Sequence, residues 1–335
     1  MGKLDKYFAI INNSEWGKYY GPDLLKFLDW DDLPKTLKDL DRYDPKDKDP
    51  FEVPGDDGTR HITEMLTEAG IATRTLPYHN IENFQRAYWE GRQAIDEVER
   101  LAKTEFPEAV KLAASLAIAS HDFYHTGSTY LREDEKSPDY RTVEGRSALI
   151  VDQKLKEKGY SPLFRAFVAH IIWASSFGKN AVEPEGFFGR LMRAVDVNLP
   201  DDFARFIYES MAVWYGEIPA GPRPKTLEEF IKNRENFLKY VEATNKDLNE
   251  AAKNHVASLF SEEDRKKLQE GLKQKSLTER LGWDSRLEKM REAMEKAKDP
   301  NSSEGNILRS SWEYWTSRAT KGNEENDRGD RGESA

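Results

Sequence analysis

The pattern of apolar and polar positions predicts a chain built of helices. Between residues 78 and 103, apolar side chains recur at steps of three and four, which is the period of an amphipathic helix. These positions are Ile81, Phe84, Tyr88, Gly91, Ile95 and Val98. A polar stripe of His79, Asn83, Arg86 and Glu90 follows another side of the same predicted helix. Such a stripe is either a solvated face or the polar wall of a cleft.

The next predicted helix is almost uncharged and leads into a cluster of chemically active residues. Residues 110–120 carry a single charge, at Lys111, and a helix that is apolar on all sides belongs in a core. His121 and Asp122 follow at once, with His125 three residues further on. Burying a carboxylate is costly unless a partner neutralises it. The cluster is therefore either a site for a divalent metal or a capping Asp beside one hydrogen-bonded core histidine.

The remaining periodic segments predict further helices and no strand. They cover residues 142–158, 161–177, 187–197, 202–215 and 226–253, so the predicted fold class is all-α. We expect residues 1–60 to be an accessory segment and linker, and residues 61–255 to form the main helical domain. Residues 256–320 are rich in Glu and Lys and predict a C-terminal helical extension. The polar residues 321–335 are expected to be a disordered tail.

Composition narrows the classes of function. The 335 residues carry a net charge of −10, which argues against general binding to nucleic acid or to anionic membranes. There is no cysteine, so disulfides, thiolate metal sites and cysteine nucleophiles are excluded. The first residues are too polar for a signal peptide, and no apolar run approaches the roughly 18 residues of a membrane span. From these features we expect a cytoplasmic protein.

Three short motifs together resemble the HD superfamily of metal-dependent phosphohydrolases. They are Tyr78-His79-Asn80, His121-Asp122-x-x-His125, and the lone Asp196 that ends an apolar helix. The first two look like the cyclic-nucleotide phosphodiesterase branch. The segment 144–147 is similar to the Glu-x-x-Ser helix of small bacterial members, and the segment 233–238 resembles their closing helix. The resemblance covers about residues 75–241 and implies a helical bundle of the HD-domain type.

The resemblance implies roles for individual residues. His121, Asp122 and Asp196 fall on the metal ligands of the family, and Asp122 and Asp196 could also take a proton from the attacking water. His79 falls on the histidine that protonates the leaving oxygen in the phosphodiesterase branch, and His125 on a histidine beside the phosphate and the bridging water.

Side chains that would contact the substrate are a separate prediction. A guanidinium matches the geometry of a phosphate, so Arg86 and Arg146 could bind its charge. Glu144 belongs to the same motif as Arg146 and is included among the substrate-binding candidates. Each of the two arginines could instead be an ordinary surface residue.

One position departs from the family pattern. The first metal ligand of the family is a histidine four residues after the position of His79, and this chain has Asn83 there. An amide oxygen binds hard cations such as Mg²⁺ but is a poor ligand for Zn²⁺ or Fe. The site is therefore a variant that favours Mg²⁺ or Mn²⁺, a site completed by another residue such as Glu82 or His170, or a site that no longer binds metal. His170 could equally be a hydrogen-bonded core histidine.

The sequence leaves two main hypotheses for function. The first is hydrolysis of a phosphoester, a nucleotide or another small phosphorylated molecule, by a water activated on Mg²⁺, Mn²⁺, Zn²⁺ or Fe. The second is a non-catalytic HD-fold protein that binds a ligand or regulates a partner through a degenerate metal site. A third reading, an oxygenase with paired irons, needs more histidines than this chain offers. The C-terminal extension is a candidate surface for a protein partner or for self-association.

Overall fold

The computed structural model describes residues 58–72, 76–123, 143–160, 162–176, 184, 186–217 and 223–329. Within these ranges there are twelve α-helices and no strand, so the all-α prediction is confirmed. The first six are α3 (Gly58–Ala72), α4 (Ile81–Ala102), α5 (Glu108–Ser120), α6 (Val143–Glu157), α7 (Pro162–Trp173) and α8 (Gly186–Asp196). The last six are α9 (Phe203–Met211), α10 (Leu227–Asn254), α11 (Glu262–Gln274), α12 (Leu277–Arg280), α13 (Trp283–Lys296) and α14 (Ser303–Gly329). Residues 1–57 of the predicted accessory segment lie outside the described ranges.

Capping residues set where several helices begin. The side chain of Asn80 accepts hydrogen bonds from the backbone N–H groups of Glu82 and Asn83, so α4 starts at Ile81 rather than at Tyr78 as predicted. Asp202 caps α9 in the same way, and Thr226 caps α10. Because Asn80 is in extended conformation, the two residues before it belong to a turn and not to the helix.

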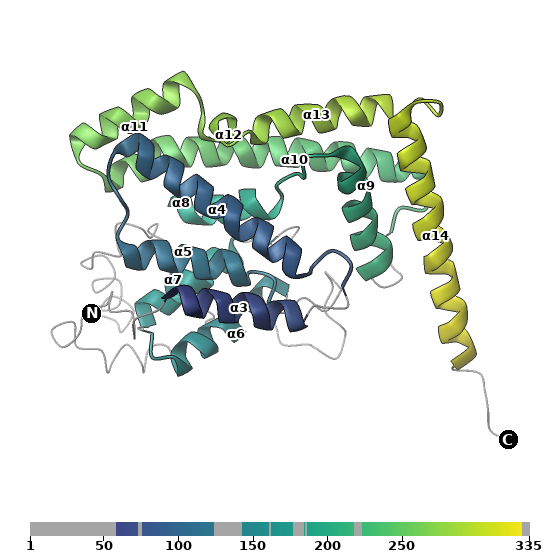
Figure 1. Ribbon diagram of the computed structural model, residues 1–335, viewed down its shortest axis with the longest axis horizontal. Helices are drawn as coiled ribbons and strands as arrows, with labels where there is room; N and C mark the ends of the chain where they lie inside the picture. Colours follow the sequence, from purple (N-terminus) through teal and green to yellow (C-terminus); the bar gives the residue numbers. More distant parts are fainter. Residues whose placement is uncertain are drawn as a thin grey trace, which may run out of the picture.

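The first hydrophobic core surrounds α5. Every described side chain of α5 between Val110 and Ser120 is buried except that of Leu112, as its apolar sequence predicted. The helix packs against α3, α4, α7 and α8 and lies in the interior of this half of the molecule (Figure 1). It thereby fixes the position of the residues that follow it, His121 and Asp122.

The C-terminal helices are built into the same body. α11, α12 and α13 run back along the 28-residue α10 (Figure 1), and α11 and α12 also pack on α4. α13 and α14 close a second core together with α9 and the N-terminal half of α10. Residues 256–320, predicted to be an extension, therefore contribute to both cores. Residues 321–329 of the segment expected to be a disordered tail continue α14.

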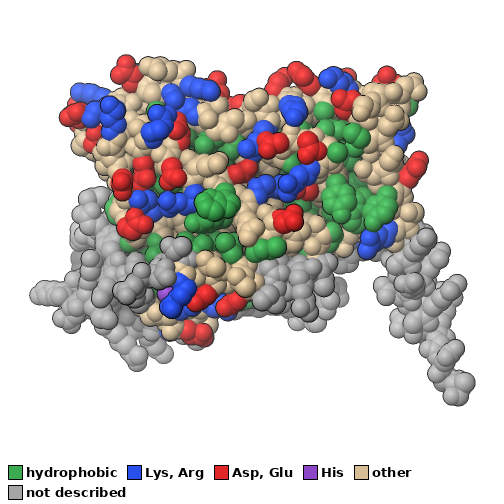
Figure 2. Space-filling model, viewed as in Figure 1, with side chains coloured by type: hydrophobic (Ala, Val, Ile, Leu, Met, Phe, Trp, Pro, Cys, Tyr) green, Lys and Arg blue, Asp and Glu red, His purple; other side chains and the backbone are tan. Residues whose placement is uncertain are grey.

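The surface is mixed in character. Figure 2 shows acidic and basic side chains interspersed over one face, with hydrophobic side chains gathered beside α9 and α14. Tyr208 and Tyr314 are exposed there, whereas Trp315 is buried against Tyr208. None of the described helices combines the length and the apolar composition that crossing a membrane requires.

Candidate metal centre

The end of α5 presents His121 in a fixed orientation. The Nδ1–H of His121 donates to the backbone carbonyl of Ile118 at 2.8 Å, as in many metal-binding histidines whose second nitrogen is held by a backbone oxygen. Its Nε2 is therefore the nitrogen that faces outward from α5. The ring is 1% exposed, and Phe84 of α4 packs edge-on against it.

Two carboxylates meet this nitrogen. Nε2 of His121 lies 3.1 Å from Oδ2 of Asp122 and 3.1 Å from Oδ1 of Asp196, the last residue of α8. One ligand atom from each of the three residues falls within 4.8 Å of the others. The structure thus brings together side chains that are 75 residues apart in the sequence.

The electrostatics of this group suit a cation. Burial would lower the pKa of His121, but Asp122 and Asp196 outweigh burial and raise that pKa well above its usual value. Burial also raises the pKa of Asp196. Two buried carboxylates beside one imidazole are a favourable place for positive charge, either from protons on the neighbouring histidines or from a metal ion. The donor set, one imidazole and two carboxylates, fits a divalent metal.

His79 lies next to this group and is held by a residue that the sequence did not single out. Its Nε2 is 3.8 Å from Oδ2 of Asp122, and its Nδ1 bonds the carboxylate of Glu217. Glu217 also accepts the backbone N–H groups of Tyr78 at 2.5 Å and of His79 at 3.0 Å. Burial lowers the pKa of His79, but Asp122 and Glu217 more than compensate, so the pKa is raised.

Glu217 ends a π-helical turn, Ala212–Glu217, that continues α9. Its side chain is fully buried, and although burial raises its pKa, the hydrogen bond and charge of His79 lower it further, so the pKa is below its usual value. No sequence pattern marks this carboxylate, because it sits 138 residues from its partner in an irregular turn. π-helical turns are frequent at functional sites.

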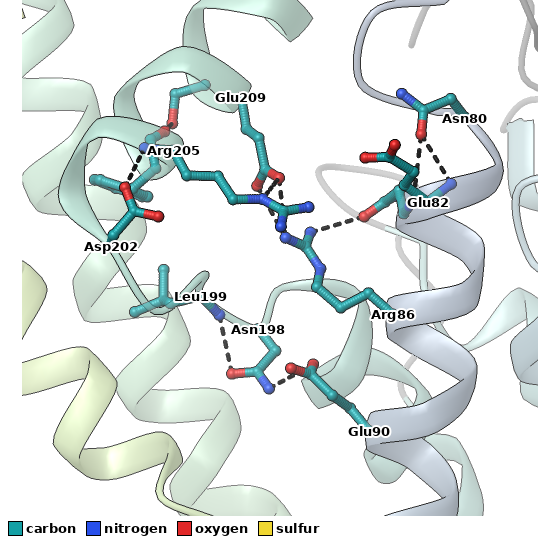
Figure 3. Close-up of polar contacts among 12 residues, drawn as sticks. Asn80, Glu82, Arg86, Glu90, Asn198, Leu199, Asp202, Arg205 and Glu209 are labelled. Atoms are coloured by element: carbon teal, nitrogen blue, oxygen red, sulfur yellow. Dashed lines mark hydrogen bonds and ion pairs between the residues drawn. The ribbon is translucent and has the colours of Figure 1, made fainter.

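The polar stripe of α4 is turned inward and paired, so the solvated-face reading is wrong. Arg86 donates two hydrogen bonds from Nη1 to the carboxylate of Glu209, at 3.0 and 3.1 Å (Figure 3). It donates a third from Nη2 to Oδ1 of Asn83 at 2.7 Å. Arg205 donates to the same carboxylate. The charge of Arg86 is therefore neutralised within the protein, and the Asn83 oxygen already accepts a hydrogen bond.

The same stripe ties α4 to the segment after Asp196. Oε2 of Glu90 accepts a hydrogen bond from Asn198 at 2.7 Å, and Figure 3 shows the two side chains meeting. Oε1 of Glu90 accepts another from Arg286 of α13 at 2.6 Å. Arg286 also pairs with Asp201. These bonds hold the end of α8, and with it Asp196, against α4.

The other predicted residues are placed differently. His125 lies outside the described residues. Glu144 and Arg146 are in α6, which packs against α7, and neither lines the cavity beside the His121 group. His170 is buried in α7 with Nε2 facing Gly189 of α8, and it is not part of the His121 group. Glu82 is exposed at the start of α4.

A cavity of about 450 Å³ opens beside the His121 group. His79 and Asp196 line it, together with Glu209 and Arg234. Asn198 and Ser210 also line it, and the rest of the wall is apolar and aromatic: Tyr78, Val197, Leu199, Pro200, Phe206, Val213, Trp214, Phe237 and Tyr240. A cavity of this size, with a few polar groups on an apolar wall, is typical of a small-molecule site.

Comparisons with known proteins add no relative. The chain matches no model of a known protein family, no curated protein and no solved structure. The function must therefore be inferred from the geometry of the site and from the motifs that compose it.

Proposed function

We propose that the protein is a metal-dependent phosphohydrolase that cleaves a small phosphoester such as a nucleotide. The observation that carries the proposal is the buried group of His121, Asp122 and Asp196 beside a cavity that also exposes His79. These four residues are among those that fall on the functional positions of the HD superfamily motif. The resemblance and the geometry both support the proposal.

The three grouped side chains would hold the metal. Nε2 of His121 and one oxygen each from Asp122 and Asp196 are the donors, and a set with more oxygen than nitrogen favours Mg²⁺ or Mn²⁺ over Zn²⁺ or Fe. Bound there, a divalent cation would lower the pKa of a water molecule and offset charge on the phosphoryl oxygens.

His79 would act on the leaving group. Hydrolysis breaks the bond between phosphorus and the ester oxygen, and that oxygen needs a proton as it leaves. Glu217 fixes the imidazole by accepting from Nδ1, so Nε2 is the atom that would deliver the proton. The two backbone hydrogen bonds to Glu217 keep the turn at residues 78–79 in place, so the imidazole is positioned before a substrate arrives.

The test combines metal binding with turnover. Metal content of the purified protein is measured first, and Mn²⁺ is then titrated by calorimetry into metal-free protein. Asp122→Asn and Asp196→Asn should each weaken binding by at least about tenfold. Asp96→Asn, at an exposed position of α4, is the matched control and should bind as wild type does. His79→Ala should keep metal binding and lower hydrolysis of a phosphoester panel by about 10²–10⁴-fold.

A second candidate function is supported by Asn83. Its side-chain oxygen already accepts a hydrogen bond from Arg86, and among the described histidines and carboxylates the group that could hold a metal has three members, His121, Asp122 and Asp196. This favours a non-catalytic protein that binds a phosphorylated ligand in the cavity. Stoichiometric Mn²⁺ binding without hydrolysis of any phosphoester on the panel would support this candidate. If Asp122→Asn and Asp196→Asn both bind Mn²⁺ as tightly as wild type does, the proposed metal site is refuted.

A further inference from the structure

Arg234 is a cavity-lining guanidinium for which the described residues supply no acidic partner. Its Nη1 donates to the Ser210 hydroxyl at 3.1 Å, and its Nε is buried with no acceptor among those residues. Within the described ranges no carboxylate lies within 4.0 Å of it, whereas Arg86 and Arg286 nearby are both paired with glutamates. The guanidinium carbon lies 5.0 Å from the ring centre of Phe237 and 5.7 Å from that of Phe230.

Such an environment is unfavourable for a charge. Burial lowers the pKa of Arg234 to about 10, so the side chain is still protonated at neutral pH. A buried cation with a single neutral acceptor is destabilising unless something else supplies negative charge. Arg234 lines the cavity, so a ligand in the cavity is in a position to supply it.

The other residues that line the cavity around Arg234 indicate the chemistry of the rest of that ligand. Glu209, an acidic residue of its wall, is already neutralised by Arg86 and Arg205. Phe237 and Trp214 are aromatic and line the same space. The cavity therefore offers a fixed cation to an anionic group and aromatic walls to an apolar or aromatic body.

We propose that Arg234 is the anion-binding residue of this cavity, and that the ligand is an organic phosphate with an aromatic body. The phosphate identity of the anion rests on the proposed function, because His79 and Asp196 face the same cavity. A guanidinium presents parallel N–H groups that match two oxygens of a phosphate. The phosphate oxygens would then supply the acceptors that the described residues do not provide.

The experiment measures binding of 1-naphthyl phosphate by calorimetry in EDTA, with 1-naphthol as the neutral control. We expect the phosphate to bind wild type more tightly than the naphthol. Arg234→Met should weaken phosphate binding by roughly tenfold to a hundredfold, the usual contribution of a charge-assisted hydrogen-bonded pair. Arg234→Lys keeps the positive charge but lacks the parallel N–H groups of the guanidinium, so it should bind the phosphate with intermediate affinity. Arg291→Met removes a positive charge that does not line the cavity and should leave phosphate binding unchanged.

Thermal melting separates a binding role from a structural one. Arg234→Met removes an unneutralised charge and keeps an apolar stem on Phe230 and Phe237, so its melting temperature should equal or exceed that of wild type. A lower melting temperature with unchanged phosphate binding would overturn the proposal, as would equal affinity of wild type for phosphate and naphthol. If Arg234→Met does not fold, Arg234→Lys decides the question. The proposal is overturned if this variant binds 1-naphthyl phosphate as tightly as wild type does. Because phosphate binding is measured in EDTA, it does not depend on a bound metal. A failure of this binding test can therefore be told apart from a failure of the metal-dependent hydrolase proposal.

Discussion

Replacing Glu217 should show that this buried carboxylate organises the site. In Glu217→Ala, the backbone N–H groups of Tyr78 and His79 and the imidazole Nδ1 would lose their common acceptor in a buried place. Hydrogen bonds to a charged acceptor are worth about 1.5–3 kcal/mol each. Removing one partner of a buried charged pair costs about 3–5 kcal/mol in total. Water that enters the space left by the side chain would replace some of these hydrogen bonds. We therefore expect Glu217→Ala to lower the free energy of unfolding by about 3–5 kcal/mol.

The isosteric variant separates stability from function. In Glu217→Gln the amide oxygen can still accept the two backbone N–H groups, so the loss of stability should be only about 1–2 kcal/mol. The amide nitrogen, however, would then face Nδ1 of His79, and this nitrogen would have to accept instead of donate. Because the neutral amide would not stabilise the imidazolium, the pKa of His79 would fall, and less of the side chain would be in the charged form that gives up a proton from Nε2. Turnover should therefore fall by about 10²-fold or more, with Mn²⁺ affinity unchanged.

The assay is urea unfolding followed by circular dichroism at 222 nm, a direct measure for an all-helical protein. Glu242→Gln is the matched control, because Glu242 makes an exposed ion pair with Arg291 and should contribute at most about 1 kcal/mol. A double-mutant cycle of Glu217→Ala with His79→Ala should give a coupling energy of about 0.5–3 kcal/mol. If Glu217→Ala unfolds at the same urea concentration as Glu242→Gln, the reasoning is refuted.

Two further predictions concern the metal ligand and an acid-sensitive helix start. Asn83→His should raise Mn²⁺ or Zn²⁺ affinity, by an amount at or above about 10–100-fold, if position 83 reaches the metal. If a calorimetric titration finds the same metal affinity for Asn83→His as for wild type, position 83 does not supply a ligand to the metal. Asp264 lies in the first turn of α11, and hydrogen bonds from Ser261, Thr104 and Lys267 lower its pKa to about 2. Its stabilising effect should be complete above about pH 4, the value for an unfolded Asp, and vanish as the pH falls toward 2. An NMR titration that finds an ordinary pKa for Asp264 would contradict this.

The sequence predicted the helices well where periodicity and capping act together. α10 begins and ends within one residue of its predicted range, 226–253, because apolar spacing and local hydrogen bonds depend on neighbours in the chain. The error at α4 has a local cause as well. Asn80 caps that helix, so His79 lies in the preceding turn and does not share a helix face with Asn83. The four-residue spacing therefore does not place these two side chains one above the other.

The candidate site was only partly predictable. His121 and Asp122 could be singled out because a carboxylate at the end of a buried helix needs a neutralising partner, and Asp196 because it falls on a ligand position of the family motif. Glu217 could not, because its importance comes from contacts with residues far away in the chain. The pairing of Arg86 with Glu209 could not be predicted from the sequence either, because the two residues are far apart in the chain. Charge pairing is a property of the tertiary structure, and local patterns do not encode it.

The C-terminal helix gives the last prediction, because it supports the turn that carries Glu217. Gly216 lies between Pro77 and the Trp315 ring, and a Cβ on Gly216 would come within 2.8 Å of the proline and 3.0 Å of the tryptophan. Trp315 is 3% exposed, so Trp315→Ala should cost about 3–5 kcal/mol.

Because the indole packs on the residue next to Glu217, the same variant should also lower turnover. Its Nε1 is buried, and the described residues offer it no acceptor, so Trp315→Phe should cost less than an ordinary tryptophan truncation. Removal of residues 321–335 should leave the melting temperature unchanged, since their composition buries little apolar surface. If that truncation destabilises the protein as much as Trp315→Ala does, the contacts that hold α14 in place extend beyond Trp315.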